Sequence, residues 1–311
     1  MSTPGTRTGR LCEDGLVAGR ILVGTASWTD RSLVASGWYP GAVTTAEERL
    51  RYYASRFPLV EVDSTYYALP RQVMVRDWAS RTPSHFVFDV KAFSLLTQHP
   101  TRRQSIPRTI DVDSDKATIY LKDLDEHGVG QVWDRFLDGV DPLRRANKLG
   151  CLLFQFPPWF TSRSANRDYV VDCAERAAAD RVAVEFRSPS WLRPEERDRT
   201  LSFLAERSIA LVCADMPQRV DKAIPRLAAA TSADLSVVKF HGRNREGWEE
   251  SSFQGLTDYR YRPSELKGWI PDLRRLAEES AEVHVVFRNM HGDNAVRNAE
   301  QLVEQLEQAE A

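Results

Sequence analysis

Residues 182–187 read VAVEFR, an apolar run that carries its two charges, Glu185 and Arg187, at the carboxyl end. A short run rich in Val and Phe is typical of a buried parallel strand. Similar runs recur along the chain and are mostly bounded by Gly, Pro, Asp or Ser. They predict eight strands: Ile21–Ala26, Leu59–Asp63, Phe86–Lys91, Cys151–Phe156, Val182–Phe186, Ala210–Ala214, Leu235–Phe240 and Val283–Phe287.

Amphipathic helical patterns separate these strands. Residues 50–57, 169–174, 266–277 and 295–306 repeat apolar side chains at helical spacing, and Thr44 with Glu47 predicts a capping box before the first of them. Strand–helix alternation with a closing helix favours an α/β fold of the TIM (β/α)8-barrel type over an open doubly wound sheet. The sequence contains no G-x-G-x-x-G or Walker loop, which also weighs against the open sheet. We therefore expect one barrel domain over residues 21–311, after a flexible leader at residues 1–20.

One connection is longer than barrel loops usually are. About sixty residues separate Lys91 from Cys151, between the third and fourth strands, and they include the basic stretch TRRQSIPR at residues 101–108. Two interpretations stay open for this insertion: a lid or rim over the functional face, and a surface insertion.

Composition narrows the class of protein. A formal net charge of −2 and 42% hydrophobic residues indicate an ordinary globular chain without the basic excess of a nucleic-acid-binding protein. No run reaches the ~18 apolar residues of a membrane span, and the N-terminus lacks the apolar core of a secretory signal. Cys12, Cys151, Cys173 and Cys213 show no metal-site spacing, so we expect reduced thiols and a cytoplasmic protein.

Polar and aromatic residues gather at the predicted strand ends, where this fold places its functional face. Cations there outnumber carboxylates, which favours an anionic ligand, and the aromatic rings could form the walls of a pocket. The structural alternative is a buried ion network that holds the barrel closed, for example Glu185 with Lys239 or Lys91. The candidate ligand-binding residues are Trp28, Asp63, Tyr66, Lys91, Gln155, Arg187, Trp191, Asp215, Arg243 and Asn289.

Several longer segments have a family pattern. They include VGTASW at residues 23–28, GWYPG at 37–41, LGCLLFQFPPWF at 149–160, VAVEFRSPSW at 182–191 and VVKFHGRN at 237–244. In these segments the chain resembles the YecE-like family, a domain of unknown function with family number 72, over nearly all of its length beyond residue 20. The resemblance implies a TIM barrel and implies no reaction.

The sequence departs from that family pattern at three places. Asp63 and Arg288 stand where the family often has Asn, and residues 109–128 look like an insertion relative to compact members. Arg288 makes this pocket more cationic than the family pattern, so its substrate need not be the one that other members of the family bind.

Three functions remain open on the sequence alone. The first is binding or transformation of a small phosphorylated or carboxylated metabolite without a redox cofactor, with Glu185, Lys239 and His241 as catalytic candidates. The second is a divalent-metal isomerase or hydrolase with Glu185, Asp215 and His241 as ligands, in which case a divalent metal is the cofactor. The third is a non-catalytic binding barrel or a nucleic-acid-associated protein that uses TRRQSIPR.

Overall fold

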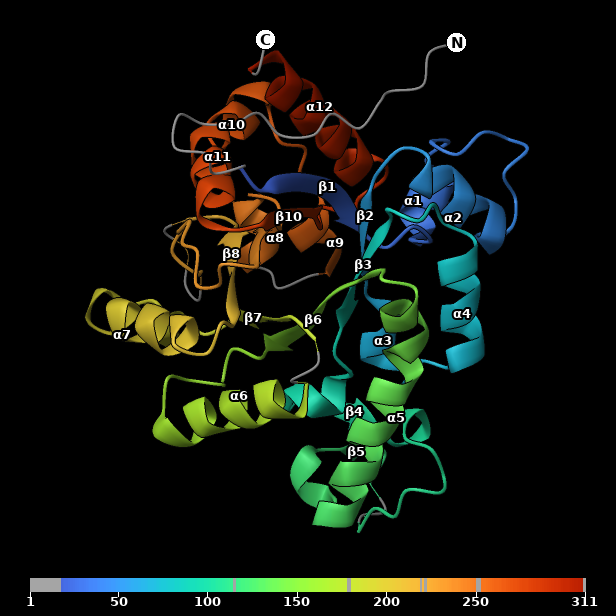
Figure 1. The fold of residues 1–311 in the computed structure, drawn as a ribbon, viewed down its shortest axis with the longest axis vertical. Coiled ribbons are helices and arrows are strands. Elements are labelled where there is room, and N and C mark those ends of the chain that lie inside the picture. Colours follow the sequence, from blue (N-terminus) through green and yellow to red (C-terminus); the bar gives the residue numbers. More distant parts are fainter. Residues whose placement is uncertain are drawn as a thin grey trace.

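The computed structural model describes residues 18–113, 116–177, 180–218, 220, 223–249 and 253–309 (Figure 1). Most of the expected leader, together with Cys12, lies outside these residues, and the first strand already begins at Arg20. In the part of the chain that is described, no helix is both long and apolar enough to cross a membrane.

Eight parallel strands close into a barrel in the order β1-β10-β9-β8-β7-β6-β3-β2, which confirms the predicted fold. Each predicted strand is present, with ends that differ by at most two residues. The strands are β1 Arg20–Ala26, β2 Leu59–Val62, β3 Val87–Lys91, β6 Leu149–Phe156, β7 Val182–Phe186, β8 Ala210–Asp215, β9 Leu235–Phe240 and β10 Glu282–Phe287.

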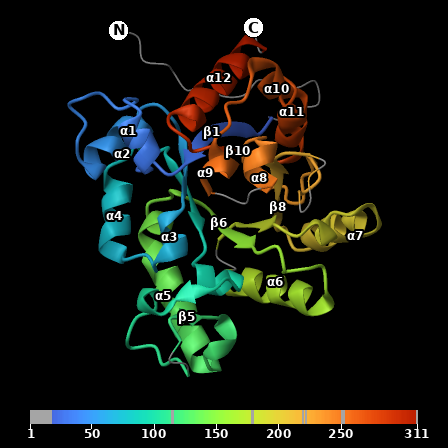
Figure 2. The same cartoon turned by 180° about the vertical axis from the view of Figure 1, so that it is seen from behind.

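Helices cover the outside of the barrel, as the front and rear views show (Figures 1 and 2). They are α1 Arg31–Ala35, α2 Ala46–Ala54, α3 Ser64–Tyr67, α4 Gln72–Ser80, α5 Glu126–Arg145, α6 Ser164–Arg176, α7 Pro194–Ala205, α8 Arg245–Glu249, α9 Phe253–Thr257, α10 Pro263–Lys267, α11 Ile270–Glu279 and α12 Asn294–Gln308. Between β8 and β9 the described residues form no helix, so the alternation is interrupted once.

Two helix predictions need correction. The capping box of α2 uses Thr45 and Glu48, one residue later than predicted, because the Thr45 side chain accepts from the Glu48 backbone N–H. The pattern over residues 266–277 belongs to two helices, α10 and α11. Pro271 lies in the first turn of α11, where the backbone N–H groups have no partner within the helix, so the N–H that proline lacks is not needed there.

The insertion after β3 has structure of its own. It forms short 3-10 turns, η1 Ser94–Thr97, η2 Arg103–Ser105 and η3 Leu121–Asp123, and a small antiparallel sheet of β4 Thr101–Arg102 and β5 Thr118–Ile119. Helix α5 then leads back to the barrel. Figure 1 shows this sheet and the start of α5 at the end of the molecule opposite α12.

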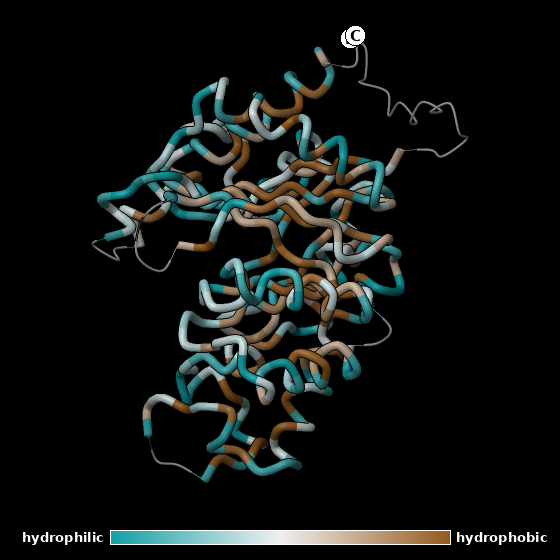
Figure 3. Tube along the Cα trace, turned by 90° about the vertical axis from the view of Figure 1, so that its left-hand side faces the viewer, coloured by the Kyte–Doolittle hydropathy of each residue, from teal (hydrophilic) through white to brown (hydrophobic). Residues whose placement is uncertain are grey.

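The strands bury both faces, and the two faces form separate cores. Cys151, Leu153, Ala183, Val212 and Val237 belong to a cluster inside the barrel. The residues between them, such as Leu152, Val184 and Leu211, pack outward against the helices. Figure 3 shows hydrophobic residues along the strands at the middle of the molecule. Alternate residues on each strand therefore face the interior, and this period of two decides which strand-end side chains can meet.

Candidate functional site

Charged residues occur in pairs two positions apart at the carboxyl ends of the barrel strands. Glu61 with Asp63 on β2, Glu185 with Arg187 on β7 and Lys239 with His241 on β9 all lie at positions that face the barrel interior, as does Lys91 at the end of β3. Since residues two apart on a strand share a face, both members of each pair lie inside the barrel or at its mouth.

Lys239 joins two carboxylates across the barrel interior. Its Nζ lies 2.7 Å from Glu61 Oε1 and 3.1 Å from Glu185 Oε2. The other oxygen of Glu185, Oε1, lies 3.0 Å from His241 Nε2 and 3.0 Å from Arg187 Nη1. Glu185 is therefore the centre of an ion network that links β2, β7 and β9.

The protonation states follow from burial and from these contacts. Burial opposes ionisation of Glu185, but Lys239, His241 and Arg187 outweigh it and hold the pKa well below its usual range. Burial alone would lower the pKa of Lys239, yet Glu185 and Glu61 raise it. Burial lowers the pKa of His241 to about 3, so the neutral imidazole can donate an N–H to Glu185. Burial raises the pKa of Glu61 to about 7.

A second, looser group lies beside this network. Lys91 Nζ is 3.5 Å from Asp63 Oδ1 and 4.7 Å from the centre of the Tyr66 ring. Arg288 Nε is 3.8 Å from the other Asp63 oxygen. The Asp63 and Arg288 side chains are 15% and 17% exposed, whereas the Lys91 side chain is 5% exposed.

Aromatic rings surround the loose group. The His99 ring lies 5.3 Å from the Tyr66 ring and 5.9 Å from the Trp159 ring, which is 59% exposed. The Arg187 guanidinium lies 5.3 Å from the centre of the Trp248 ring. His99 follows η1, so the first part of the insertion contributes to the barrel mouth.

Two predicted aromatic ligand contacts lie elsewhere. Trp28 is buried in the layer between barrel and helices, with its ring 5.5 Å from that of Trp78. Trp191 is fully buried and stacks on Phe186 at 4.0 Å. Their surroundings are those of packing residues.

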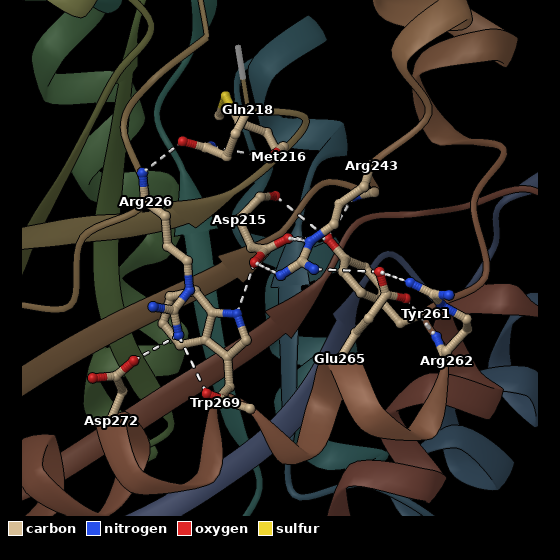
Figure 4. Close-up of polar contacts among 12 residues, drawn as sticks. Asp215, Met216, Gln218, Arg226, Arg243, Tyr261, Arg262, Glu265, Trp269 and Asp272 are labelled. Atoms are coloured by element: carbon tan, nitrogen blue, oxygen red, sulfur yellow. Dashed lines mark hydrogen bonds and ion pairs between the residues drawn. The ribbon is translucent and has the colours of Figure 1, made fainter.

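Asp215 and Arg243 form a separate network outside the barrel (Figure 4). Arg243 donates to both Asp215 oxygens, at 2.8 and 2.6 Å, while Tyr261 donates to Oδ1 and Trp269 to Oδ2. Asp215 has the outward phase of β8, like Leu211, which turns its carboxylate toward α10 and α11. Its carboxylate thus bonds a set of side chains different from those around Glu185.

The remaining predicted residues are Gln155 and Asn289. Gln155 is the register partner of Glu185 on β6 and is partly exposed at the mouth. Asn289 is fully buried, and its amide donates to the carbonyl of Tyr259 at 2.7 Å and to Asn298 at 2.9 Å. Asn289 therefore holds the chain after β10 against α12.

The proposed metal set of Glu185, Asp215 and His241 is not assembled, since Asp215 faces outward. In the described residues, the donor atoms of Asp89, Cys151 and His284 do lie within 4.8 Å of one another inside the barrel. Burial disfavours a charged His284 imidazole, but Asp89 and Glu282 outweigh burial and raise the pKa of His284 to about 9. Burial also raises the pKa of the Cys151 thiol. A metal ion would have to displace both protons.

Two surface grooves lie beside the insertion, away from the mouth. One, of about 890 Å³, runs between residues 68–72, 104–108 and α5. The other is lined by Arg102, Arg103 and Arg108. The basic stretch TRRQSIPR thus faces these grooves, while His99 just before it reaches the mouth.

Three mouth residues were missing from the predicted site: Glu61, His99 and Trp248. Arg288, which the sequence places in the pocket as an added cation, lies beside Asp63. Glu61 carries a signal, because it stands two residues before Asp63 and therefore faces the same side of its strand, the barrel interior. His99 and Trp248 lie in loops, where no period assigns a direction.

The fold and the polar mouth define a (β/α)8-type barrel protein with an ionic network at the carboxyl ends of its strands. The chain belongs to the family whose model is described as "Protein of unknown function DUF72", which matches residues 22–311. This finding confirms the resemblance seen in the sequence.

Known relatives match this chain over most of its length. The chain is 33% identical over 293 residues to the UPF0759 protein YunF of Bacillus subtilis, covering 92% of this chain and 95% of that protein. A solved DUF72 family protein from Enterococcus faecalis superimposes with a TM-score of 0.76 at 27% identity, covering 92% of this chain and 95% of that one. Another from Thermotoga maritima gives 0.73 at 26% identity, covering 93% and 99%.

Proposed function

We propose that the barrel mouth binds a small anionic metabolite, with a phosphate or carboxylate group between Lys91, Arg187 and Arg288. The observation that carries this proposal is the charge balance of the mouth. Lys91, Arg187, Lys239 and Arg288 stand against Glu61, Asp63 and Glu185, four cations against three carboxylates.

The histidines of the mouth do not change this balance. Burial lowers the pKa of His99 to about 4 and that of His241 to about 3, so both are neutral at physiological pH. Since Glu61 has a pKa of about 7, part of its negative charge is missing at pH 7, whereas Lys91, with a pKa of about 8, keeps most of its positive charge at that pH. An anion would therefore find uncompensated positive charge in a partly desolvated site, where Coulomb attraction is stronger than in water.

The cations differ in their readiness to bind a ligand. Lys239 is fully buried and is engaged by two carboxylates. Lys91 and Arg288 share Asp63 at 3.5 and 3.8 Å, longer than the short contacts of Lys239. A bidentate guanidinium contact from Arg187 or Arg288 suits a phosphate or carboxylate, and Tyr66, Trp159 and Trp248 offer flat walls for an uncharged part.

We also propose a reducing compartment, the cytoplasm, for this protein. Cys151, Cys173 and Cys213 are free and buried, and their packing is that of small hydrophobic side chains.

Calorimetric titration with inorganic phosphate and sulfate, with glucose as a neutral comparison, tests the anion site. We expect saturable binding of the anions, and Arg187→Gln should weaken it at least about tenfold, which is ~1.4 kcal/mol. Arg145→Gln is the matched control, because the Arg145 side chain is 82% exposed on α5. Absence of saturable anion binding, or equal binding by the Arg187→Gln variant, would overturn the proposal.

A further inference from the structure

The two lysines inside the barrel have different surroundings. Lys239 is held by Glu61 at 2.7 Å and Glu185 at 3.1 Å, and its side chain is fully buried. Lys91 has one carboxylate, Asp63, at 3.5 Å, and its ammonium lies over the face of Tyr66. Strong pairing with two carboxylates fixes Lys239 as an ammonium. The single, longer carboxylate contact of Lys91 holds its proton less firmly, although the Tyr66 ring face also attracts the ammonium.

Burial and the charges around Lys91 together lower its pKa, although the charges do not all act in one direction. Burial lowers the pKa of Lys91 to about 8, and although Asp63 raises it, Arg288 and Lys239 lower it further. At pH 8 about half of the Lys91 side chains would be neutral amines, which are nucleophiles. Lys239 differs, because Glu185 and Glu61 raise its pKa despite burial.

The position of Lys91 is suitable for contact with a bound anion. Burial lowers the pKa of His99 and the charges of Lys91 and Arg187 lower it further, so both cations lie within electrostatic reach of this ring. Arg288 shares Asp63 with Lys91. An anionic group bound by the two arginines would hold the rest of a small molecule close to Lys91 Nζ.

We propose that Lys91 forms an imine with the carbonyl carbon of a small anionic oxo compound, such as a 2-oxo acid or a phosphorylated aldehyde or ketone. This inference rests on the proposed function, because the anionic group of the compound would occupy the same site. It adds a covalent step and a substrate class to that site.

The step is balanced without a redox partner. The neutral amine of Lys91 attacks the carbonyl carbon, the C=O π electrons move to oxygen, and the carbinolamine loses that oxygen as water. Overall, an ammonium and a carbonyl compound give a protonated imine and one water, whose two hydrogens come from the ammonium. Glu61, with a pKa near 7, is a carboxyl group that can take up and return protons at neutral pH.

Reductive trapping with cyanoborohydride at pH 8 tests the inference on the full wild-type chain. Glyoxylate serves as the anionic probe and propionaldehyde as the neutral one, and peptide mapping by mass spectrometry locates the reduced adduct. With glyoxylate, we expect Lys91 to be modified at least roughly tenfold faster than the exposed Lys267. Lys91→Arg should abolish the fast adduct, and added phosphate should slow it.

The two probes separate failure of the covalent step from failure of anion binding. Modification of Lys91 no faster than that of Lys267 by either probe would overturn the imine, even if phosphate still binds. Fast modification of Lys91 by both probes at equal rates, without protection by phosphate, would support a reactive amine and refute the anion site. Because wild-type protein carries the main measurement, the result does not depend on whether the variant folds.

Discussion

Lys239 Nζ lies between Glu61 Oε1 at 2.7 Å and Glu185 Oε2 at 3.1 Å, so one ammonium of β9 bridges β2 and β7 through the barrel interior. These strands are not neighbours in the barrel. The bridge thus ties together parts of the wall that share no backbone hydrogen bonds, and it brings the Glu185 carboxylate to Arg187 and His241 at the mouth. The buried ion network and the proposed anion site therefore share Glu185.

Removal of the bridging cation should be costly. Lys239→Met leaves Glu61 and Glu185 buried without their shared partner, and we expect it to lower the free energy of unfolding by about 3–5 kcal/mol. Urea denaturation measures this loss. Adding Glu61→Gln should recover part of it, because one unpaired charge is removed, whereas Lys267→Met on the surface should change stability by less than about 0.5 kcal/mol. Equal stabilities for Lys239→Met and Lys267→Met would contradict the bridging role.

A second ion network near the strand N-termini predicts a pH dependence. His284 Nδ1 lies 3.0 Å from Asp89 and Nε2 lies 3.3 Å from Glu282, and these carboxylates outweigh burial and raise the His284 pKa to about 9. Since this folded-state pKa exceeds the unfolded value near 6.5, the stabilisation is fully present below about pH 6.5. It is lost as the pH rises through 9, and it amounts to about 3 kcal/mol.

The difference in unfolding free energy between the wild type and His284→Gln isolates this contribution from groups that titrate elsewhere. We expect a difference that is largest at pH 6 and shrinks by pH 9.5. An NMR titration of the wild-type imidazole should give a midpoint near 9. A difference that is constant between pH 6 and 9.5 would show that the imidazole is not held as a cation.

The architecture could be predicted from the sequence because each strand is buried on both faces. Continuous apolar runs such as Cys151–Phe156 mark such strands directly, and helical periods between them fix the parallel connections. The position of the site follows for the same reason, since parallel strands all end at one face. Lys91, Glu185, Arg187, Lys239 and His241 indeed meet there.

What the strand ends could not provide was the direction of each side chain. Asp215 is the last residue of β8, and Glu185 is the last residue but one of β7. The Asp215 side chain nevertheless points out of the barrel, where it bonds Arg243 and Trp269. Counting the period of two within each strand would have separated these acids and would have included Glu61. Loop residues such as His99 have no such period, and their place depends on how the insertion packs.

Two glycines test the packing that the fold requires. A Cβ at Gly24 on β1 would lie 2.0 Å from the carbonyl oxygen of Leu59 on β2, so Gly24→Ala must push the two strands apart. We expect a loss of about 2–3 kcal/mol in urea denaturation. Gly130, within α5, has open space around its Cβ position, and Gly130→Ala should raise stability by about 0.5–1 kcal/mol. Similar effects of the two substitutions would contradict the close approach of β1 and β2.

The separation of the Asp215 network from the mouth predicts opposite effects for two variants. Asp215→Asn weakens the contacts with Arg243, Tyr261 and Trp269 in a buried site, so it should cost about 3 kcal/mol of stability. Phosphate binding should stay within about twofold of the wild type, which corresponds to ~0.4 kcal/mol. Arg187→Gln should do the reverse, because Glu185 keeps Lys239 and His241 as partners while the anion loses a guanidinium.

Urea denaturation and phosphate titration of the same preparations measure both effects. We expect the Arg187→Gln variant to lose less than about 1 kcal/mol of stability, since the Arg187 side chain is partly exposed. If Asp215→Asn abolished phosphate binding at a temperature where the variant is folded, Asp215 would have to act on the mouth. The backbone of β8 offers such a route, because His241 N–H donates to the Asp215 carbonyl at 2.8 Å. Retained binding would show that the mouth does not need the side-chain charge of Asp215.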